Sequence, residues 1–435
     1  MSDPMSVSAG CAVSENTQGK PRLRIGMFVH LDLPWMAHPF FTNSFKIRTR
    51  KQLETLLQLD LGRVRIDPAR SDPEPEELPP VEPEIDAEAR DQLRADLEAS
   101  LWEEKNARIR VLKERRKRLN LCAKRYRQSV VLARKLMSHL RSAPAQAAEE
   151  ADVLVSQMVE DLTADHEATV QLVNLKSQDE NTYHHAINVM ALALVAGRKL
   201  RLDPDTLRLL GLAALFHDLG LQRIPSQILH KKGDWNKPER ALYEQHPRYG
   251  VEIARSIGTL PEAVVEVIGK HHEHIDGSGY PEGLNGNALG MLTRIVSVVN
   301  RYDNLCNGAR SGRGLSPHQA VSSMYTKERA RYDPRVLTTL ITNLGVYPPG
   351  TVVRLDDERI AVVISINPDA LLKPNVLVYS PEIPNDQALI LDLSEEEASI
   401  RESLHQSELT EDIIEYLNLS DKLSYYVQSG SGKGR

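Results

Sequence analysis

An almost wholly apolar run, residues 207–216, ends in the adjacent polar pair His217 and Asp218. The run predicts one helix over residues 204–219 that lies in a protein core, with Gly220 as its C-terminal stop. A charge inside such a core is strongly unfavourable unless it has a partner. The pair therefore predicts a polar cavity inside a domain whose other segments, by their apolar spacing, are helical as well.

Histidines in the neighbouring segments can supply the partners that this cavity needs. His185 lies in T-Y-H-H-A, His246 in Q-H-P-R-Y-G, and the pair His271 and His272 opens H-H-E-H-I-D-G-S-G-Y-P. Imidazoles and one carboxylate at fixed intervals on helices suit borderline divalent metals such as Fe or Mn. The carboxylate of Asp218 can bridge two cations about 3.5–4 Å apart.

Two further histidines leave the set of inward-facing residues open. His184 is an alternative to His185, because either member of an adjacent pair on a helix can face the cavity. We expect His274 to point to solvent.

Composition and charge exclude several classes of function. Aromatic residues make up 5% of the chain and its net charge is -6, which argues against a base-stacking platform and against duplex nucleic acid as a partner. The 3 cysteines lie far apart, so neither a disulfide framework nor a thiolate zinc site is indicated. No apolar run approaches the ~18 residues of a membrane span. The polar N-terminus lacks a signal-peptide pattern, so we expect a cytoplasmic protein.

Shifts in pattern divide the 435 residues into six expected parts and predict a mainly α fold. They are a disordered start (1–20), a small α/β accessory domain (21–67), an acidic proline-rich linker (68–90), a basic helical connector (91–150), an all-α catalytic domain (151–346) and a small β-rich extension (347–425).

The accessory domain is expected to hold strands at 24–29, 45–47 and 64–66, with a helix capped by Thr49. Its aromatic residues predict a small core, with a ligand groove as the alternative. These residues are Trp35, Phe40, Phe41 and Phe45.

The connector is strongly basic between residues 108 and 127 and carries a narrow apolar stripe. The stripe consists of Ile109, Leu112, Leu119 and Cys122. A solvated or coiled-coil helix is the first interpretation. An acidic partner, a nucleotide, an anionic membrane surface or self-association as a homodimer are alternatives.

The remaining segments follow simple periodicity. Residues 170–175 are expected to be helical, and residues 352–355, 360–366 and 376–379 to form three strands before a helix at 409–417. This tail shows no obvious chemistry.

Together these motifs resemble the HD-GYP family of cyclic di-GMP phosphodiesterases, a branch of the HD metal phosphohydrolases. The resemblance covers about residues 170–346 and is carried by L-F-H-D-L-G, I-P-S-Q-I-L, H-P-R-Y-G and the H-H-E to G-Y-P block. The segment from R-I-G-M-F-V to F-K-I is similar to an N-terminal accessory domain common in this family.

The resemblance implies two divalent metal ions, Fe or Mn, and hydrolysis of cyclic di-GMP to linear pGpG or further to GMP. It implies that His217 and Asp218 carry the catalysis. A degenerate module that binds metal or nucleotide and acts as a sensor or docking unit is the alternative, and a phosphohydrolase for another nucleotide is a third. By position the resemblance assigns metal ligation to seven residues, which are His185, His217, Asp218, His246, His271, His272 and Asn300.

The loop from Gly277 to Pro281 is used in the family near the substrate and for contacts with signalling proteins. The resemblance therefore implies substrate contacts for Gly279 and Tyr280, with a plain turn as the alternative for the glycines. Other substrate contacts are expected from Arg310 and Arg313, which fall near an arginine that the family uses for a substrate phosphate; a solvated loop is the alternative there.

Three departures from the family pattern affect the expected site. Leu221 stands where the family has a lysine for a substrate phosphate, and Asn300 stands where it has a metal-binding aspartate. An amide brings no charge, so that metal should bind more weakly. Asn181 replaces a glutamate found in members with three metals, so we expect two at most. Asp303 follows Asn300 by about one helical turn, which predicts that it is a weak substitute.

Overall fold

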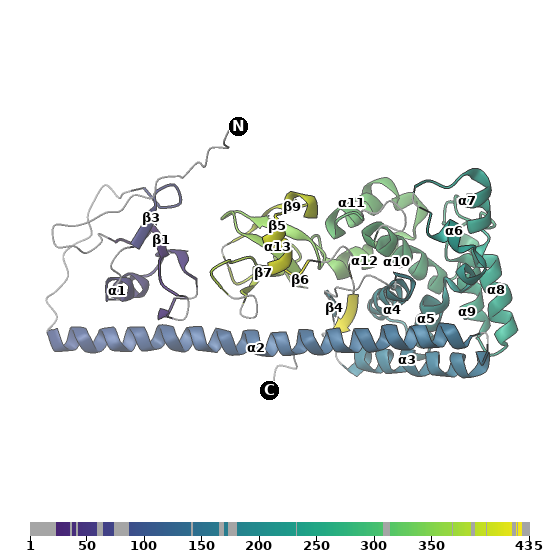
Figure 1. Cartoon of the computed structure of the whole chain (residues 1–435), viewed down its shortest axis with the longest axis horizontal. Helices are drawn as coiled ribbons and strands as arrows, with labels where there is room; N and C mark the ends of the chain where they lie inside the picture. The colour runs from purple at the N-terminus through teal and green to yellow at the C-terminus, as the bar shows by residue number, and fades with distance from the viewer. Residues whose placement is uncertain are drawn as a thin grey trace. The chain divides into compact units, whose positions relative to one another are not determined.

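The computed structural model describes residues 23–34, 37–40, 42–58, 64–73, 87–140, 142–164, 169–172, 181–231, 233–307, 314–367, 369–383, 388–396, 398–419, 423 and 425–428. The chain forms two compact units, the first made of Met1–Glu114 with Ser380–Gln387 and the second of Arg115–Tyr379 with Ala388–Arg435 (Figure 1). Several expectations lie outside the described residues: the disordered start, Trp35, Phe41, Arg310 and Arg313.

The described part of the first unit contains a three-stranded antiparallel sheet, one short helix and the beginning of the long helix α2 (Ala87–His139). The strands are β1 (Phe28–Leu31), β2 (Ser44–Lys46) and β3 (Val64–Asp67), with β1 in the centre. Helix α1 (Arg50–Gln58) follows β2, and Thr49 Oγ1 accepts a hydrogen bond from the backbone of Gln52 as the predicted cap. The first strand starts later than expected, because Gly26 adopts a positive φ of 92° and places a turn there.

The described aromatic residues of this unit favour a core over a groove. Phe40 is buried, and its ring lies 4.7 Å from that of Phe45. Both belong to an apolar cluster with Val29, Leu31 and other strand residues.

A long helix, α2 (Ala87–His139), leads into the second unit. Its second half buries one face at helical spacing and packs beside α3 (Pro144–Ala164), with ion pairs Arg125–Asp161 and Lys135–Glu150 along the rim. This half of α2 is therefore an amphipathic helix that packs along one face, which agrees with the expected coiled-coil helix better than with a fully solvated one. The buried residues are Cys122, Tyr126, Val130, Ala133 and Leu136.

The predicted mainly α fold is confirmed: the described residues between 181 and 344 of the second unit form a bundle of helices in which α10 contacts α4, α5 and α9, and α5 contacts α4 and α9 (Figure 1). In chain order they are α4 (Asn181–Lys199), α5 (Pro204–Phe216), α6 (Ser226–Leu229), α7 (Lys237–Tyr243), α8 (His246–Ile257), α9 (Glu262–Lys270), α10 (Met291–Asn307), α11 (Pro317–Lys327) and α12 (Pro334–Leu344), with short 3-10 turns at η2 (Leu219–Arg223), η3 (Gly286–Ala288) and η4 (Arg329–Arg331).

Local signals determine where these helices begin. Asp203 caps α5 by accepting from the backbone of Thr206. The predicted capping box of Asn236 and Glu239 at the start of α7 is confirmed. None of the helices in the described ranges is long and apolar enough to cross a membrane.

The expected role of Gly220 as a helix stop is wrong. Helix α5 already ends at Phe216, and Gly220 lies in the 3-10 turn η2. A Cβ atom on Gly220 would lie 1.8 Å from the carbonyl oxygen of His246 and 2.5 Å from the nitrogen of Gly250. The glycine is therefore required for close approach of η2 to α8.

The C-terminal residues form a five-stranded antiparallel sheet with the order β8-β7-β6-β5-β9. The three predicted strands are present, and two were missed because their apolar alternation is short. The elements are β5 (Val352–Leu355), β6 (Ile360–Ser365), β7 (Asn375–Val378), β8 (Ile390–Asp392), β9 (Ile400–Leu404), η6 (Gln406–Glu408) and α13 (Glu411–Tyr416).

The helical interpretation of residues 170–175 is wrong where the structure describes them. Strand β4 (Thr169–Leu172) pairs antiparallel with the last strand, β10 (Tyr425–Gln428), which Figure 1 draws in yellow beside it. Val170 lies opposite Val427. Because the partner of β4 is more than 250 residues away in the sequence, local periodicity could not reveal the pairing.

Candidate metal centre

Six side chains from separate helices converge in the interior of the second unit. His185 comes from α4, His217 and Asp218 from the residues after α5, His246 from the first position of α8, and His271 with His272 from the turn after α9. Their ligand atoms form two groups, each within 4.8 Å, that share Asp218. The groups are His185, His217 and Asp218 (first group) and Asp218, His246, His271 and His272 (second group).

The two oxygens of Asp218 face different groups. Oδ2 lies 3.4 Å from Nε2 of His217 and 3.7 Å from Nε2 of His185. Oδ1 lies 3.4 Å from Nε2 of His246 and 3.5 Å from Nε2 of His271. The carboxylate therefore lies between two sets of imidazole nitrogens, which is the placement of a bridging ligand.

Within each group, paired imidazole nitrogens approach closely. Nε2 of His185 and Nε2 of His217 are 3.2 Å apart, and so are Nε2 of His246 and Nε2 of His271. Two nitrogens bonded to one cation at about 2.1 Å are roughly 3.0–3.4 Å apart for bond angles between roughly 90° and 110°. Both pairs match this separation.

Backbone hydrogen bonds determine which nitrogen of three imidazoles faces the cavity. In each case Nδ1 lies within hydrogen-bond distance of the carbonyl three residues earlier, and because a carbonyl only accepts, Nδ1 carries the proton. The contacts are His217 to Ala214 (2.7 Å), His246 to Tyr243 (2.8 Å) and His271 to Ile268 (2.9 Å).

Burial keeps several of these imidazoles neutral. It lowers the pKa of His217 to about 3 and also lowers the pKa of His271 and, still further, that of His272. Burial alone would raise the pKa of Asp218, but the neighbouring histidines, His217 first, hold it well below its ordinary value. The centre therefore presents neutral nitrogen lone pairs and one ionised carboxylate.

This donor set fits divalent cations. Nε2 of His246 and Nε2 of His271 face each other at 3.2 Å, and in the imidazole tautomer that carries its proton on Nδ1 each of these atoms presents a lone pair. Asp218 Oδ1 is buried and has no hydrogen-bond partner. Lone pairs and a carboxylate oxygen directed at one space are left unsatisfied unless a cation lies among them.

Comparisons with known proteins agree with this geometry. A family model described as "HD domain" matches residues 157–336, and one described as "Domain of unknown function (DUF3391)" matches residues 21–151. The cyclic di-GMP phosphodiesterase PA4108 of Pseudomonas aeruginosa is 31% identical over 360 residues, which cover 82% of this chain and 83% of that protein. The chain belongs to the HD-GYP family of phosphodiesterases.

Two other relatives match shorter stretches of the chain. The cyclic di-GMP phosphodiesterase response regulator RpfG of Xanthomonas campestris is 30% identical over 151 residues, 34% of this chain and 40% of that protein. The 3'3'-cGAMP-specific phosphodiesterase 1 of Vibrio cholerae is 32% identical over 181 residues, 40% of each chain. The HD domain carries divalent-metal chemistry in this family, in agreement with the two groups of ligand atoms.

The fourth imidazole, His185, is held by a side chain instead of a carbonyl. Its Nδ1 lies 2.6 Å from Oδ2 of Asp303, which is fully buried. Burial alone would lower the pKa of His185, but the hydrogen bond and charge of Asp303 outweigh it and raise that pKa. The expectation that Asp303 is only a weak substitute ligand missed this role, because the helical turn that separates it from Asn300 points it at the histidine.

The structure also separates the two candidates at positions 184 and 185. Nδ1 of His184 lies 2.9 Å from the hydroxyl of Tyr126 on α2, away from the two groups. Nδ1 of His274 lies 2.9 Å from Oγ of Ser278, and the ring of His274 contacts the ring of Tyr332. Neither belongs to the two groups of ligand atoms.

The G-Y-P loop is fastened by a residue that the motif analysis did not single out. Glu273 is buried, and its carboxylate accepts from the backbone nitrogens of Glu282 and Leu284 at 2.7 and 2.8 Å. A Cβ atom on Gly279 would lie 2.4 Å from the Cα of Glu273, so only glycine fits there. Tyr280 consequently stacks on His272 of the second group, with ring centroids 4.5 Å apart.

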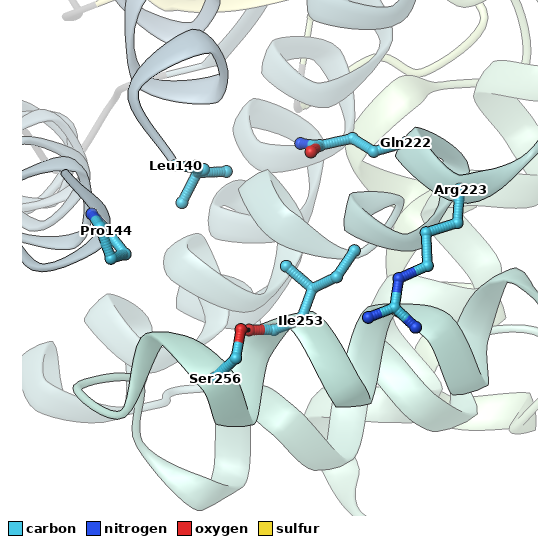
Figure 2. Close-up of a pocket in the computed structure, with 6 residues that line it drawn as sticks. All are labelled: Leu140, Pro144, Gln222, Arg223, Ile253 and Ser256. Atoms are coloured by element: carbon cyan, nitrogen blue, oxygen red, sulfur yellow. Dashed lines mark hydrogen bonds between the residues drawn. The ribbon is translucent and has the colours of Figure 1, made fainter. Parts of the chain in front are cut away.

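Leu221 is one of the three departures from the HD-GYP pattern. It lies in η2, next to Gln222 and Arg223. Those two residues line a cavity of about 440 Å³. Figure 2 shows this cavity with its remaining lining residues, Leu140, Pro144, Ile253 and Ser256. None of the six converging side chains lines it, so the cavity is separate from the metal centre. Arg223 pairs there with Glu252.

The amide at position 300 lies beside the first group. Asn300 is buried, its Oδ1 accepts from Asn304 Nδ2 at 2.6 Å, and its side chain interacts with the imidazole of His185. The missing negative charge at Asn300 therefore affects the electrostatics of the first group more than those of the second.

Proposed function

We propose that this chain hydrolyses cyclic di-GMP with two divalent cations, Fe or Mn, held on either side of Asp218. One observation carries the proposal: the two carboxylate oxygens of Asp218 face two separate pairs of imidazole nitrogens, each pair 3.2 Å apart. The relatives named as cyclic di-GMP phosphodiesterases support the substrate.

The residues of the chain would divide the work as follows. His185, His217 and Asp218 hold the first cation, with the amide of Asn300 beside them; Asp218, His246, His271 and His272 hold the second. Bound cations would supply Lewis acidity toward the phosphodiester and lower the pKa of a water. Fixed Nδ1 hydrogen bonds prevent His217, His246 and His271 from rotating out of position.

Substrate contacts are proposed on the side of the G-Y-P loop. Tyr280 stacks on His272, so a substrate bound at the second group meets its ring and the backbone at Gly279. Arg310 and Arg313 are proposed to meet a phosphate. The same loop, between Gly277 and Pro281, is proposed as the contact surface for signalling partners.

Product analysis tests the activity. Purified protein loaded with Mn²⁺ or Fe²⁺ and incubated with cyclic di-GMP should release pGpG, with GMP if a second cut follows. His217→Ala and Asp218→Ala should each lower turnover by more than about 100-fold and lower the metal content, because each removes a ligand. Asp276→Ala, on the exposed loop, is a matched control that should retain metal. Unchanged turnover in either ligand variant contradicts the proposal.

The alternative, a degenerate module that binds without turnover, gives a different result. It predicts bound metal or nucleotide with no product, and turnover that rises when Leu221→Lys is combined with Asn300→Asp. Preferential cleavage of 3'3'-cGAMP in the same assay would assign the substrate class of the Vibrio cholerae relative instead.

A further inference from the structure

The carboxylate that orients His185 is itself held by two amides. Asp303 Oδ1 accepts from Nδ2 of Asn188 at 2.8 Å and from Nδ2 of Asn307 at 2.9 Å, while Oδ2 faces His185. Since Asp303 is fully buried, its orientation depends on these partners.

Asn188 is saturated with hydrogen bonds, and two of them reach the C-terminal residues. Its Nδ2 donates to Asp303 and to the carbonyl of Leu423 at 2.9 Å. Its Oδ1 accepts from the backbone nitrogen of Tyr425 at 3.0 Å and from the hydroxyl of Tyr126 at 3.1 Å. An amide with all four positions filled has one fixed orientation.

Asn307 forms a second connection to the same residue. Its Oδ1 accepts from the backbone nitrogen of Leu423 at 2.8 Å, and its Nδ2 donates to the carbonyl of Leu423 at 3.2 Å as well as to Asp303. Both amides that hold Asp303 are thus held by the backbone of Leu423.

The strand that follows Leu423 fastens this contact to the fold. Strand β10 pairs with β4 over four residues. Tyr425 is fully buried, and its hydroxyl lies 3.1 Å from that of Tyr302 and donates to the carbonyl of Pro349. Leu423 is therefore adjacent to a firmly anchored strand.

We propose that Leu423 and strand β10 are a positioning element for the first metal group, acting through Asn188 and Asn307 on Asp303 and through Asp303 on His185. The inference rests on the proposed two-cation site and adds to it a part of the chain that lies outside the matched HD domain.

The second metal group does not share this connection to the C-terminal residues. His246 and His271 are oriented by carbonyls three residues before them, within their own helices or turns. No contact described for those two imidazoles involves residues 423–428. Loss of the C-terminal contacts should therefore weaken the binding of a cation by the first group and leave binding by the second group unchanged.

Metal titration of the full chain tests this. Removal of residues 423–435 should lower the Mn²⁺ affinity of the first group (His185, His217 and Asp218) by on the order of 10-fold or more. The Mn²⁺ affinity of the second group should stay unchanged. Asn307→Ala, at the partly exposed end of α10, should do the same without removing a strand, and its helical circular dichroism shows whether it folds. His185→Ala and His246→Ala identify which binding step belongs to which group.

Matched controls separate the outcomes. Removal of residues 429–435 alone, or Asn367→Ala between β6 and β7, should leave both affinities unchanged. The positioning role is overturned if both test variants bind two Mn²⁺ ions with unaltered affinity, or if both groups lose affinity equally. Either result leaves the two-cation site in place. A wild-type chain that binds fewer than two Mn²⁺ ions overturns both.

Discussion

At the scale of single residues, the centre depends on which nitrogen of each imidazole faces inward. Three backbone carbonyls and the carboxylate of Asp303 keep Nδ1 occupied, so Nε2 is left for a cation. Residue types and spacing predict that histidines and an aspartate meet. They also allow Asp218 to bridge two cations, and the structure adds which of its oxygens faces which group.

The amide at position 300 gives a prediction at this scale. Asn300→Asp should raise the affinity for the first cation by about tenfold, since a carboxylate near a cation adds attraction of more than about 1.4 kcal/mol at this depth. Titration with Mn²⁺ measures it. Asn367→Asp adds the same charge between β6 and β7 and should change nothing; equal gains in both variants would assign the effect to net charge.

At the scale of elements, the position of Asp218 depends on how closely η2 approaches α8. Both Gly220 and Gly250 lie at this contact, and a Cβ atom on Gly220 would overlap the backbone of His246. The contact brings the ligands at the end of α5 and the start of α8 together. A motif such as L-F-H-D-L-G therefore includes its glycine for packing as well as its histidine and aspartate for chemistry.

Gly220→Ala should destabilise the protein by about 1–3 kcal/mol or more, because the added methyl group forces η2 and α8 apart. Denaturant unfolding of the metal-free protein measures the free energy. Gly290→Ala is the matched control, since a Cβ atom there would only approach Glu266 Oε1 at 3.9 Å. Similar stability in the two variants would show that the bundle adapts to the methyl group.

At the scale of the whole molecule, the buried histidines couple stability to pH. His217 has its pKa lowered to about 3 by burial, and the pKa values of His271 and His272 are lowered too. A histidine of this kind favours the folded state above its unfolded pKa of about 6.5, and this stability is lost as pH falls toward the folded value. His185 has a raised pKa, so its contribution to stability is fully present below pH 6.5 and is lost only as the pH rises through its folded pKa; it adds no slope on the acid side.

Metal-free protein should therefore lose stability between pH 6.5 and 4, by up to about 1.4 kcal/mol per pH unit for each histidine whose pKa is lowered in the folded state. Denaturant unfolding at several pH values measures the slope. His217→Gln should make it shallower, whereas His405→Gln, at the start of η6, should leave it unchanged. A flat profile in the wild type would contradict the burial of neutral imidazoles.

The sequence by itself determined the fold class and indicated a divalent-metal site, because apolar periodicity specifies helices and only a few residue types bind divalent metals. It also placed all six converging side chains among its candidate ligands, with His184 left open as an alternative to His185. Tertiary structure decided which of His184 and His185 faces inward, since the rotation of α4 depends on its packing against α5 and α10. It also decided that Asp303 holds His185 and that Leu423 meets Asn188 across 235 residues. Hydrogen bonds over such separations leave no trace in local periodicity, because only the folded chain brings their donors and acceptors together.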